Sequence, residues 1–189
     1  MKNELPSFFN DESESDKYES LVDFWLSWTL RCANICNLEE HNKKIGEYSK
    51  RILSYCLTKK QDPHFLDGKK IKDIKCWKYF STGNGQIDLW FEITIDETNY
   101  VLIFENKVYA RLDEGQLEKY KSSINEFYKD KNVEIIFIFF RAHDDFLEND
   151  QKYCDKNDFV PILFTDLQNL MGEKELTEND LFDEFWFRW

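Results

Sequence analysis

The stretch that decides the fold is residues 86–107, QIDLWFEITIDETNYVLIFENK. Apolar residues alternate with polar ones through 86–95 and dominate 100–107, which predicts two neighbouring β-strands. Residues 96–99 between them read DETN, a polar sequence typical of turns. We therefore expect an antiparallel hairpin with a four-residue loop.

A symmetric loop of this length fixes which residues face each other. It would place Asp88 opposite Lys107, with Glu105 on the same face and diagonally across from Asp88, roughly 7–8 Å away at the backbone. A slip of one residue would move the side chains to opposite faces. The other face of the hairpin supports this register, because it would gather a shared apolar core from Leu89, Phe91, Ile93, Ile95, Leu102 and Phe104.

Two carboxylates and a lysine on one strand pair suit phosphodiester chemistry. Asp88 and Glu105 would offer the hard oxygen ligands that Mg²⁺ or Mn²⁺ prefers. A bound ion can polarise a phosphoryl oxygen and activate a water, and Lys107 would help to position that water. The alternative is an ordinary cross-strand ion pair at a strand end, worth about 0–1 kcal/mol where it is exposed.

The sequence on both sides of the hairpin predicts the remaining elements from its periodicity. The central part reads as helix, three-strand meander, helix, strand, and the last strand is apolar enough to be covered on both faces. The terminal LFDEFWFRW should pack its aromatic rings onto the body. The expected helices are 20–37, 39–57, 112–130 and a short one from 166 to 171, and the further strands are 71–80, 133–140 and 159–164.

Residues 83–92 (GNGQIDLWFE) and 100–120 (YVLIFENKVYARLDEGQLEKY) resemble the PD-(D/E)XK nuclease superfamily, especially its RecB-like members. The resemblance implies an α/β, restriction-endonuclease-like core with a mixed central sheet and flanking helices. It implies that Asp88 is the aspartate of the second strand and that Glu105 and Lys107 are the Glu-x-Lys of the third.

The same resemblance assigns two residues of the following helix and one of a preceding helix. Gln116 and Tyr120 fit its Gln-x-x-x-Tyr pattern, and their spacing puts them on one helix face. A helix before the first strand often adds an acidic residue, for which Glu47 is the candidate, with Glu39 and Glu40 nearby. The implied metal ligands are Asp88, Glu105 and Glu47. Ile87 stands where the family name has a proline.

Length and composition favour one intracellular domain. The chain has 189 residues, which fits a flexible acidic N-terminus at 1–19 and a single domain at 20–189, with its core at about 41–140 and an extension at 141–189. No secretory leader is recognised, and the longest apolar run is too short to span a bilayer. Five scattered cysteines suggest reduced thiols. We therefore expect a cytoplasmic protein.

The charge is unevenly distributed along the chain. The formal net charge is −12, yet residues 41–80 carry 11 basic and 4 acidic side chains. We expect this basic stretch to flank the metal centre and to face nucleic acid, with DNA as the expected substrate. A homodimer or a protein partner is also possible. Two alternatives remain open: a catalytically idle nuclease-like binding module, and an acidic inhibitor or immunity-type protein that mimics nucleic acid.

Overall fold

A five-stranded mixed sheet forms the centre of the computed structural model, which describes residues 17–34, 42–81, 85–172 and 175–188. The strand order is β1-β2-β3-β4-β5. The first three strands form an antiparallel meander, whereas β4 runs parallel to β3 and β5 runs parallel to β4. The strands are β1 Ile71–Ser81, β2 Gln86–Ile95, β3 Thr98–Lys107, β4 Glu134–Arg141 and β5 Val160–Leu163.

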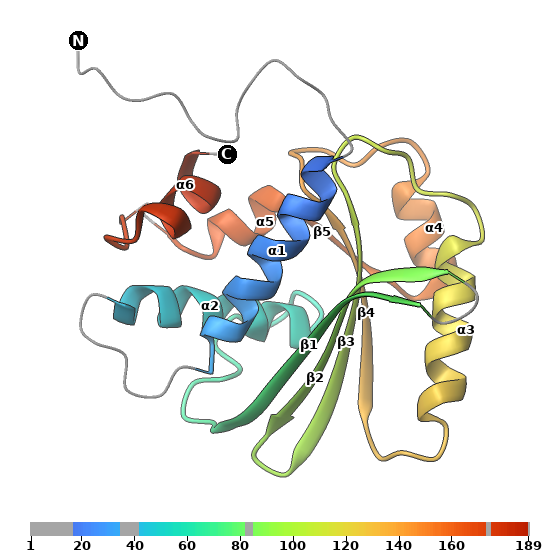
Figure 1. Cartoon of the computed structure of the whole chain (residues 1–189), viewed down its shortest axis with the longest axis horizontal. Coiled ribbons are helices and arrows are strands. Elements are labelled where there is room, and N and C mark those ends of the chain that lie inside the picture. The colour runs from blue at the N-terminus through green and yellow to red at the C-terminus, as the bar shows by residue number, and fades with distance from the viewer. Residues whose placement is uncertain (1–16, 35–41, 82–84, 173–174, 189) are drawn as a thin grey trace.

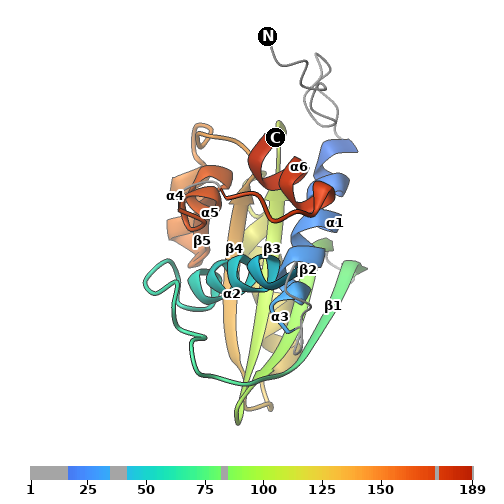
Figure 2. The ribbon, with the colours of Figure 1, turned by 90° about the vertical axis from the view of Figure 1, so that its left-hand side faces the viewer.

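Helices cover both faces of this sheet (Figure 1). One face carries α1, α2, α5 and α6, and the other carries α3 and α4, as the turned view in Figure 2 also shows. The predicted α/β class and the order helix, three-strand meander, helix, strand are confirmed. The helices are α1 Lys17–Cys32, α2 Lys43–Leu57, α3 Gln116–Tyr128, α4 Asp150–Asn157, α5 Phe164–Asn169 and α6 Asp180–Arg188.

Alternation along the strands feeds two apolar cores, one on each side of the sheet. The six hairpin residues predicted to share a core lie together, buried beneath α1, α2 and α6. Strand β4 is apolar on both faces, so Ile138 enters this first core while Phe137 and Phe139 enter the second, beneath α3. The aromatic C-terminus packs back as expected, with Phe182 and Trp186 fully buried.

The β2–β3 turn is tighter than predicted. Ile95 pairs with Thr98, so the turn has two residues, Asp96 and Glu97, instead of four. Asp96 adopts a left-handed φ of 51°, which aspartate tolerates, and it exchanges hydrogen bonds with Lys70. The pairing therefore differs from the predicted one by two residues, and an even change keeps the six predicted core residues on one face.

Other boundaries also differ from the predictions. Helix α1 begins at Lys17, so Glu19 belongs to a helix and not to the predicted flexible N-terminus, of which residues 1–16 lie outside the described part. Helix α4 was not predicted, because its sequence DQKYCDKN is largely polar and Cys154 alone of its apolar residues is fully buried. Among the described residues, no helix combines the length and apolar character needed to cross a bilayer.

Candidate active site

Asp88 and Glu105 meet where the β2–β3 ladder ends. The last regular pair is Leu89 with Phe104, and beyond it Oδ2 of Asp88 accepts a hydrogen bond from the backbone N–H of Asn106 at 2.7 Å. The tighter register turns Asp88 toward Glu105 instead of Lys107. The two carboxyl groups come within hydrogen-bonding reach of each other.

The two carboxylate oxygens of Glu105 have different surroundings. Oε1 accepts hydrogen bonds from Nζ of Lys107 at 2.6 Å and from Nε2 of Gln116 at 2.7 Å. Oε2 is buried and receives no hydrogen bond within the described part of the chain. Since a buried carboxylate oxygen without a donor is costly, this atom calls for a proton or a cation.

Burial and like charge control the protonation of this pair. Burial, followed by the nearby Asp88 carboxylate, raises the pKa of Glu105 to about 8. Burial also raises the pKa of Asp88, although the Asn106 N–H and Lys107 oppose the change. Burial alone would lower the pKa of Lys107. The adjacent Glu105 carboxylate stabilises the protonated amine by more than burial destabilises it, so this pKa lies above its usual value and the ammonium persists.

Helix α3 contributes Gln116 and Tyr120, and the structure brings both side chains to the Glu105 carboxylate. Besides its bond to Glu105, Nε2 of Gln116 donates to the Tyr120 hydroxyl at 2.9 Å, and that hydroxyl donates to the carbonyl of Gln86 at 2.6 Å. Gly85 makes this approach possible, because a Cβ there would lie 2.8 Å from Cε1 of Tyr120. Because Gln116 and Tyr120 are one helical turn apart, their hydrogen bonds join α3 to the start of β2.

Helix α1 brings two further carboxyl groups that sequence reasoning missed. Glu19 lies at the rim, with Oε2 4.0 Å from Nζ of Lys107 and Oε1 accepting from the Val108 N–H. Asp23, one turn later, is buried and accepts a hydrogen bond from the side chain of Asn106. Burial, followed by the charge of Asp88, raises the pKa of Asp23 to about 7.

A buried ion pair fixes the end of β3. Arg141 lies beside Lys107 in the parallel β3–β4 register, and its Nη1 donates to the carbonyls of Val108 at 3.0 Å and Ala110 at 2.8 Å. Asp150 accepts from the same guanidinium at 2.6 Å. Both charged side chains are buried, so the pair holds the backbone that leaves Lys107 for α3.

The conserved pattern of the PD-(D/E)XK nuclease superfamily matches residues 10–180. The chain belongs to this superfamily. The match covers most of the chain and is wider than the 41–140 core expected from the sequence, since it takes in α1 and α5. The restriction-endonuclease-like architecture is therefore confirmed. Comparisons with curated proteins and with solved structures gave no significant match.

The structure does not bring Glu47 to this nuclease-type site. Helix α2 buries the stripe that contains Ile45, Tyr48 and Ile52, and Glu47 lies on its exposed side. The prediction chose Glu47 from helix phase within α2 alone and excluded Glu19 by placing it before the first helix. A signal was present, because Glu19 and Asp23 are four residues apart and in line with the buried Val22, Leu26 and Leu30.

The donor set suits a divalent cation, the group that nucleases of this superfamily typically use. Within the described ranges, no three His, Cys, Asp or Glu side chains are already arranged as a metal cluster. Two carboxyl groups side by side, one with a buried oxygen that lacks a donor, nevertheless offer the oxygen ligands that Mg²⁺ and Mn²⁺ prefer. Asp88 and Glu105 therefore fit the ion chemically, and Lys107 balances part of their charge.

Part of the basic stretch lies far from this site and does not join the expected rim, although Lys78 of β1 pairs with Leu89, next to Asp88. Lys70 and Lys72 bond to Asp96 and Glu97 at the β2–β3 turn, eight or nine residues along the sheet from Asp88 and thus roughly 26–30 Å away. Other lysines of the stretch are held elsewhere, as in the pair of Lys60 with Asp166 and that of Lys44 with Glu175. The prediction was wrong for these lysines because β1 carries Lys72 and Lys78 toward opposite ends of the sheet.

Proposed function

We propose that the chain is a Mg²⁺- or Mn²⁺-dependent nuclease that hydrolyses phosphodiester bonds in DNA. The observation that carries this proposal is the state of Glu105: one oxygen is held by Lys107 and Gln116, while the other is buried and lacks a donor. The carboxyl group as a whole is a close neighbour of Asp88. A carboxylate oriented in this way, next to a second one, is ready to share a cation.

Each side chain has a distinct role in this proposal. Asp88 and Glu105 hold the metal ion, which when bound polarises the scissile phosphate and lowers the pKa of the attacking water. Lys107 orients that water and offsets the charge that develops on the phosphoryl oxygens. Gln116 keeps the Glu105 carboxylate in one orientation, and Tyr120 keeps Gln116 in place.

We further propose that Glu19 takes the place of Glu47 as the acidic residue of the preceding helix. Its carboxylate lies 4.0 Å from the Lys107 ammonium and bonds to the backbone just after it. The Gln116 and Tyr120 pair supports a place in the RecB-like branch. The proposed setting is the cytoplasm, with one nuclease unit that includes Glu19 of α1 together with the predicted residues 20–189.

The test is a cleavage panel of single- and double-stranded DNA and RNA, with Mg²⁺ or Mn²⁺ and with EDTA. Glu105→Gln keeps the shape of the side chain and removes its charge, so metal-dependent cleavage should disappear. Glu97→Gln is the matched control, because this glutamate is exposed at the far turn. Wild-type cleavage by Glu105→Gln, from material free of contaminating nuclease, would sink the proposal.

A catalytically idle module is the second candidate, and the same ion pair favours it. Lys107 already neutralises part of the charge of Glu105 at 2.6 Å, as a purely structural pair would. Isothermal titration with Mg²⁺ separates the two functions. The nuclease should bind the ion and lose binding in Asp88→Asn, whereas an idle module would show no binding that depends on Asp88.

A further inference from the structure

Three exposed aromatic rings surround a buried tryptophan on the face of the sheet that carries α3. Trp77 and Phe80 of β1 are each 38% exposed, and Phe127 of α3 is 52% exposed. Their ring centroids lie 6.5, 4.7 and 5.2 Å from that of Trp90, all in edge-to-face contact. We call Trp77, Phe80, Phe127 and Trp90 the aromatic platform. Exposed clusters of large rings commonly mark binding surfaces.

The backbone of β1 is distorted in a way that builds this platform. Trp77 and Phe80 are three residues apart, so regular alternation would send them to opposite faces. Tyr79 between them adopts a φ of 56°, and both Trp77 and Phe80 contact Trp90. A bulky residue with positive φ is an unfavourable conformation, which points to a functional constraint at this site.

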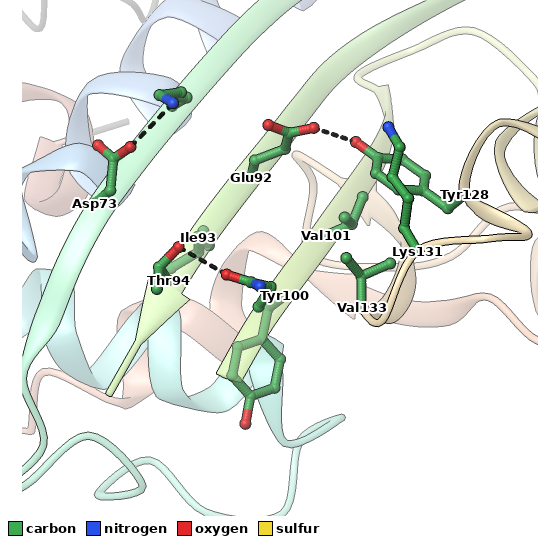
Figure 3. A pocket seen from close by; sticks show the side chains of 11 residues that line it. Asp73, Glu92, Ile93, Thr94, Tyr100, Val101, Tyr128, Lys131 and Val133 are labelled. Carbon is green, nitrogen blue, oxygen red and sulfur yellow. Dashed lines mark hydrogen bonds and ion pairs between the residues drawn. The ribbon is translucent and has the colours of Figure 1, made fainter. Parts of the chain in front are cut away.

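Trp90 is held as a rigid base for the other rings. Its Nε1 donates to the Tyr128 hydroxyl at 2.9 Å, and that hydroxyl donates to Glu92. Figure 3 shows the second of these bonds, from the end of α3 to the sheet. The acidic Glu92 is therefore already engaged, and Asp73 nearby is paired with Lys75.

The platform is continuous with the candidate active site. Trp90 follows Asp88 by two residues on β2, so the platform begins close to the site along this strand. Gln116, Tyr120 and Phe127 follow one side of α3, from the hydrogen bond with Glu105 to the platform. Eleven residues of helix separate Gln116 from Phe127, roughly 16 Å, a length that a few nucleotides can span.

A cation borders the platform at its outer end. Nζ of Lys131 lies 4.1 Å from the ring centroid of Phe127 and 4.6 Å from that of Tyr128, and Figure 3 shows Lys131 beside Tyr128. No ion pair formed by the described residues involves Lys131, so its charge is available to a phosphate. Stacking rings next to a lysine are the combination that binds single-stranded nucleic acid.

We propose that the aromatic platform stacks unpaired bases, so that the substrate is single-stranded nucleic acid or the single-stranded end of a duplex. This inference rests on the proposed nuclease function, because the platform leads to Asp88 and Glu105. Bases within a duplex present their flat faces to one another and not to protein rings, whereas every unpaired base offers a face for stacking. Lys131 holds a phosphate of the same strand.

The experiment compares Trp77→Ala and Phe127→Ala with Phe24→Ala. Phe24 is 55% exposed on α1, on the opposite side of the sheet, and Lys78 covers its ring as Lys131 covers Phe127. Binding of a fluorescent 20-nucleotide DNA strand, and of its blunt duplex, is measured by anisotropy in EDTA. Both platform variants should bind the single strand at least fivefold more weakly, while duplex binding and all binding by Phe24→Ala stay at the wild-type level.

Lys131→Gln gives a second test that does not disturb packing, and it should weaken single-strand binding and reduce its salt dependence.

Wild-type single-strand affinity in Trp77→Ala and Phe127→Ala would overturn the platform but leave the nuclease proposal intact, as long as Glu105→Gln still abolishes cleavage. A platform that instead joins two copies of the chain would show as dimers in sedimentation that Trp77→Ala dissociates, and this too would overturn the inference. Loss of the nuclease function alone would show as single-strand binding without any metal-dependent cleavage.

Discussion

Nζ of Lys107 lies 2.6 Å from Oε1 of Glu105, and both side chains project from the last three residues of β3. The ammonium is therefore bound to the carboxylate that the proposed mechanism needs for the metal. Gln116 shares the same oxygen at 2.7 Å, which leaves the second oxygen buried and without a donor. One oxygen of Glu105 is thus bound by Lys107 and Gln116, and the other remains for the proposed metal ion.

Replacing Lys107 by methionine should lower kcat/KM about 100-fold or more. The variant keeps the length of the side chain but removes the charge that balances the phosphoryl oxygens, and loss of one such group typically costs that much. Steady-state cleavage with saturating Mg²⁺ measures the effect. Lys72→Met is the control, because Lys72 pairs with Glu97 on the surface. Equal rates for the two variants would contradict the assigned role.

Metal-free protein should become less stable as the pH rises from about 5 to about 8. The pKa of Glu105 is about 8 in the folded protein and ordinarily 4.5, so between these values the folded state holds a proton that the unfolded chain has released. Linkage then makes the free energy of unfolding fall with rising pH, by several kcal/mol. Urea unfolding in EDTA across this range measures the decline.

Glu105→Gln should reduce that decline without abolishing it. Asp23 has a pKa of about 7 and contributes with the same sign. Saturating Mg²⁺ should also flatten the curve for the wild type, because the cation stabilises the ionised carboxylates in place of the proton. A stability that rises with pH in EDTA would show that Glu105 is ionised in the folded, metal-free protein.

Arg141→Met should destabilise the protein by about 3–5 kcal/mol, because it leaves Asp150 buried without a counter-charge. The double variant with Asp150→Leu should regain much of that stability, as replacement of a whole buried pair often does. Its activity should stay low, since nothing then holds the carbonyls of Val108 and Ala110 beyond Lys107. Thermal unfolding and cleavage rates, measured together, separate the two effects. Recovery of both would mean that the pair serves stability alone.

Gly85→Ala should lower both stability and activity. A methyl group there would lie 2.8 Å from the ring of Tyr120, and the φ of 148° is unfavourable for an L side chain. We expect a loss of about 1–3 kcal/mol and slower cleavage, because Tyr120 must leave Gln86. Gly68→Ala is a matched control with a φ of 76° and open space around it, so it should be strained without affecting cleavage.

The sequence was sufficient for the sheet and for the residues that lie on its strands and on α3. Strong alternation in 86–107 predicted the hairpin and the shared core of its six apolar residues. The four-residue spacing of Gln116 and Tyr120 predicted that they would act together, and they share a hydrogen bond. These features depend on local periodicity, which is visible in the sequence.

Features that depend on distant partners could not be predicted in the same way. The register was wrong by two residues because Asp96 finds a partner in Lys70, which precedes a different strand. Arg141 lay just beyond the predicted strand 133–140, and its role depends on Asp150 in an unpredicted helix. Glu19 was missed because the beginning of α1 lay in a stretch that reads as polar and acidic.

The placement of α1 has a consequence for the order in which the molecule matures. Asp23 bonds to Asn106 across 83 residues of chain, and Glu19 bonds to the backbone of Val108. During synthesis the first helix must therefore wait for β3 to emerge before it can dock. Before α1 docks, Lys107 lacks its neighbour from α1, and one face of the sheet is open to solvent. A nascent chain would thus remain inert until β3 and Val108 have left the ribosome.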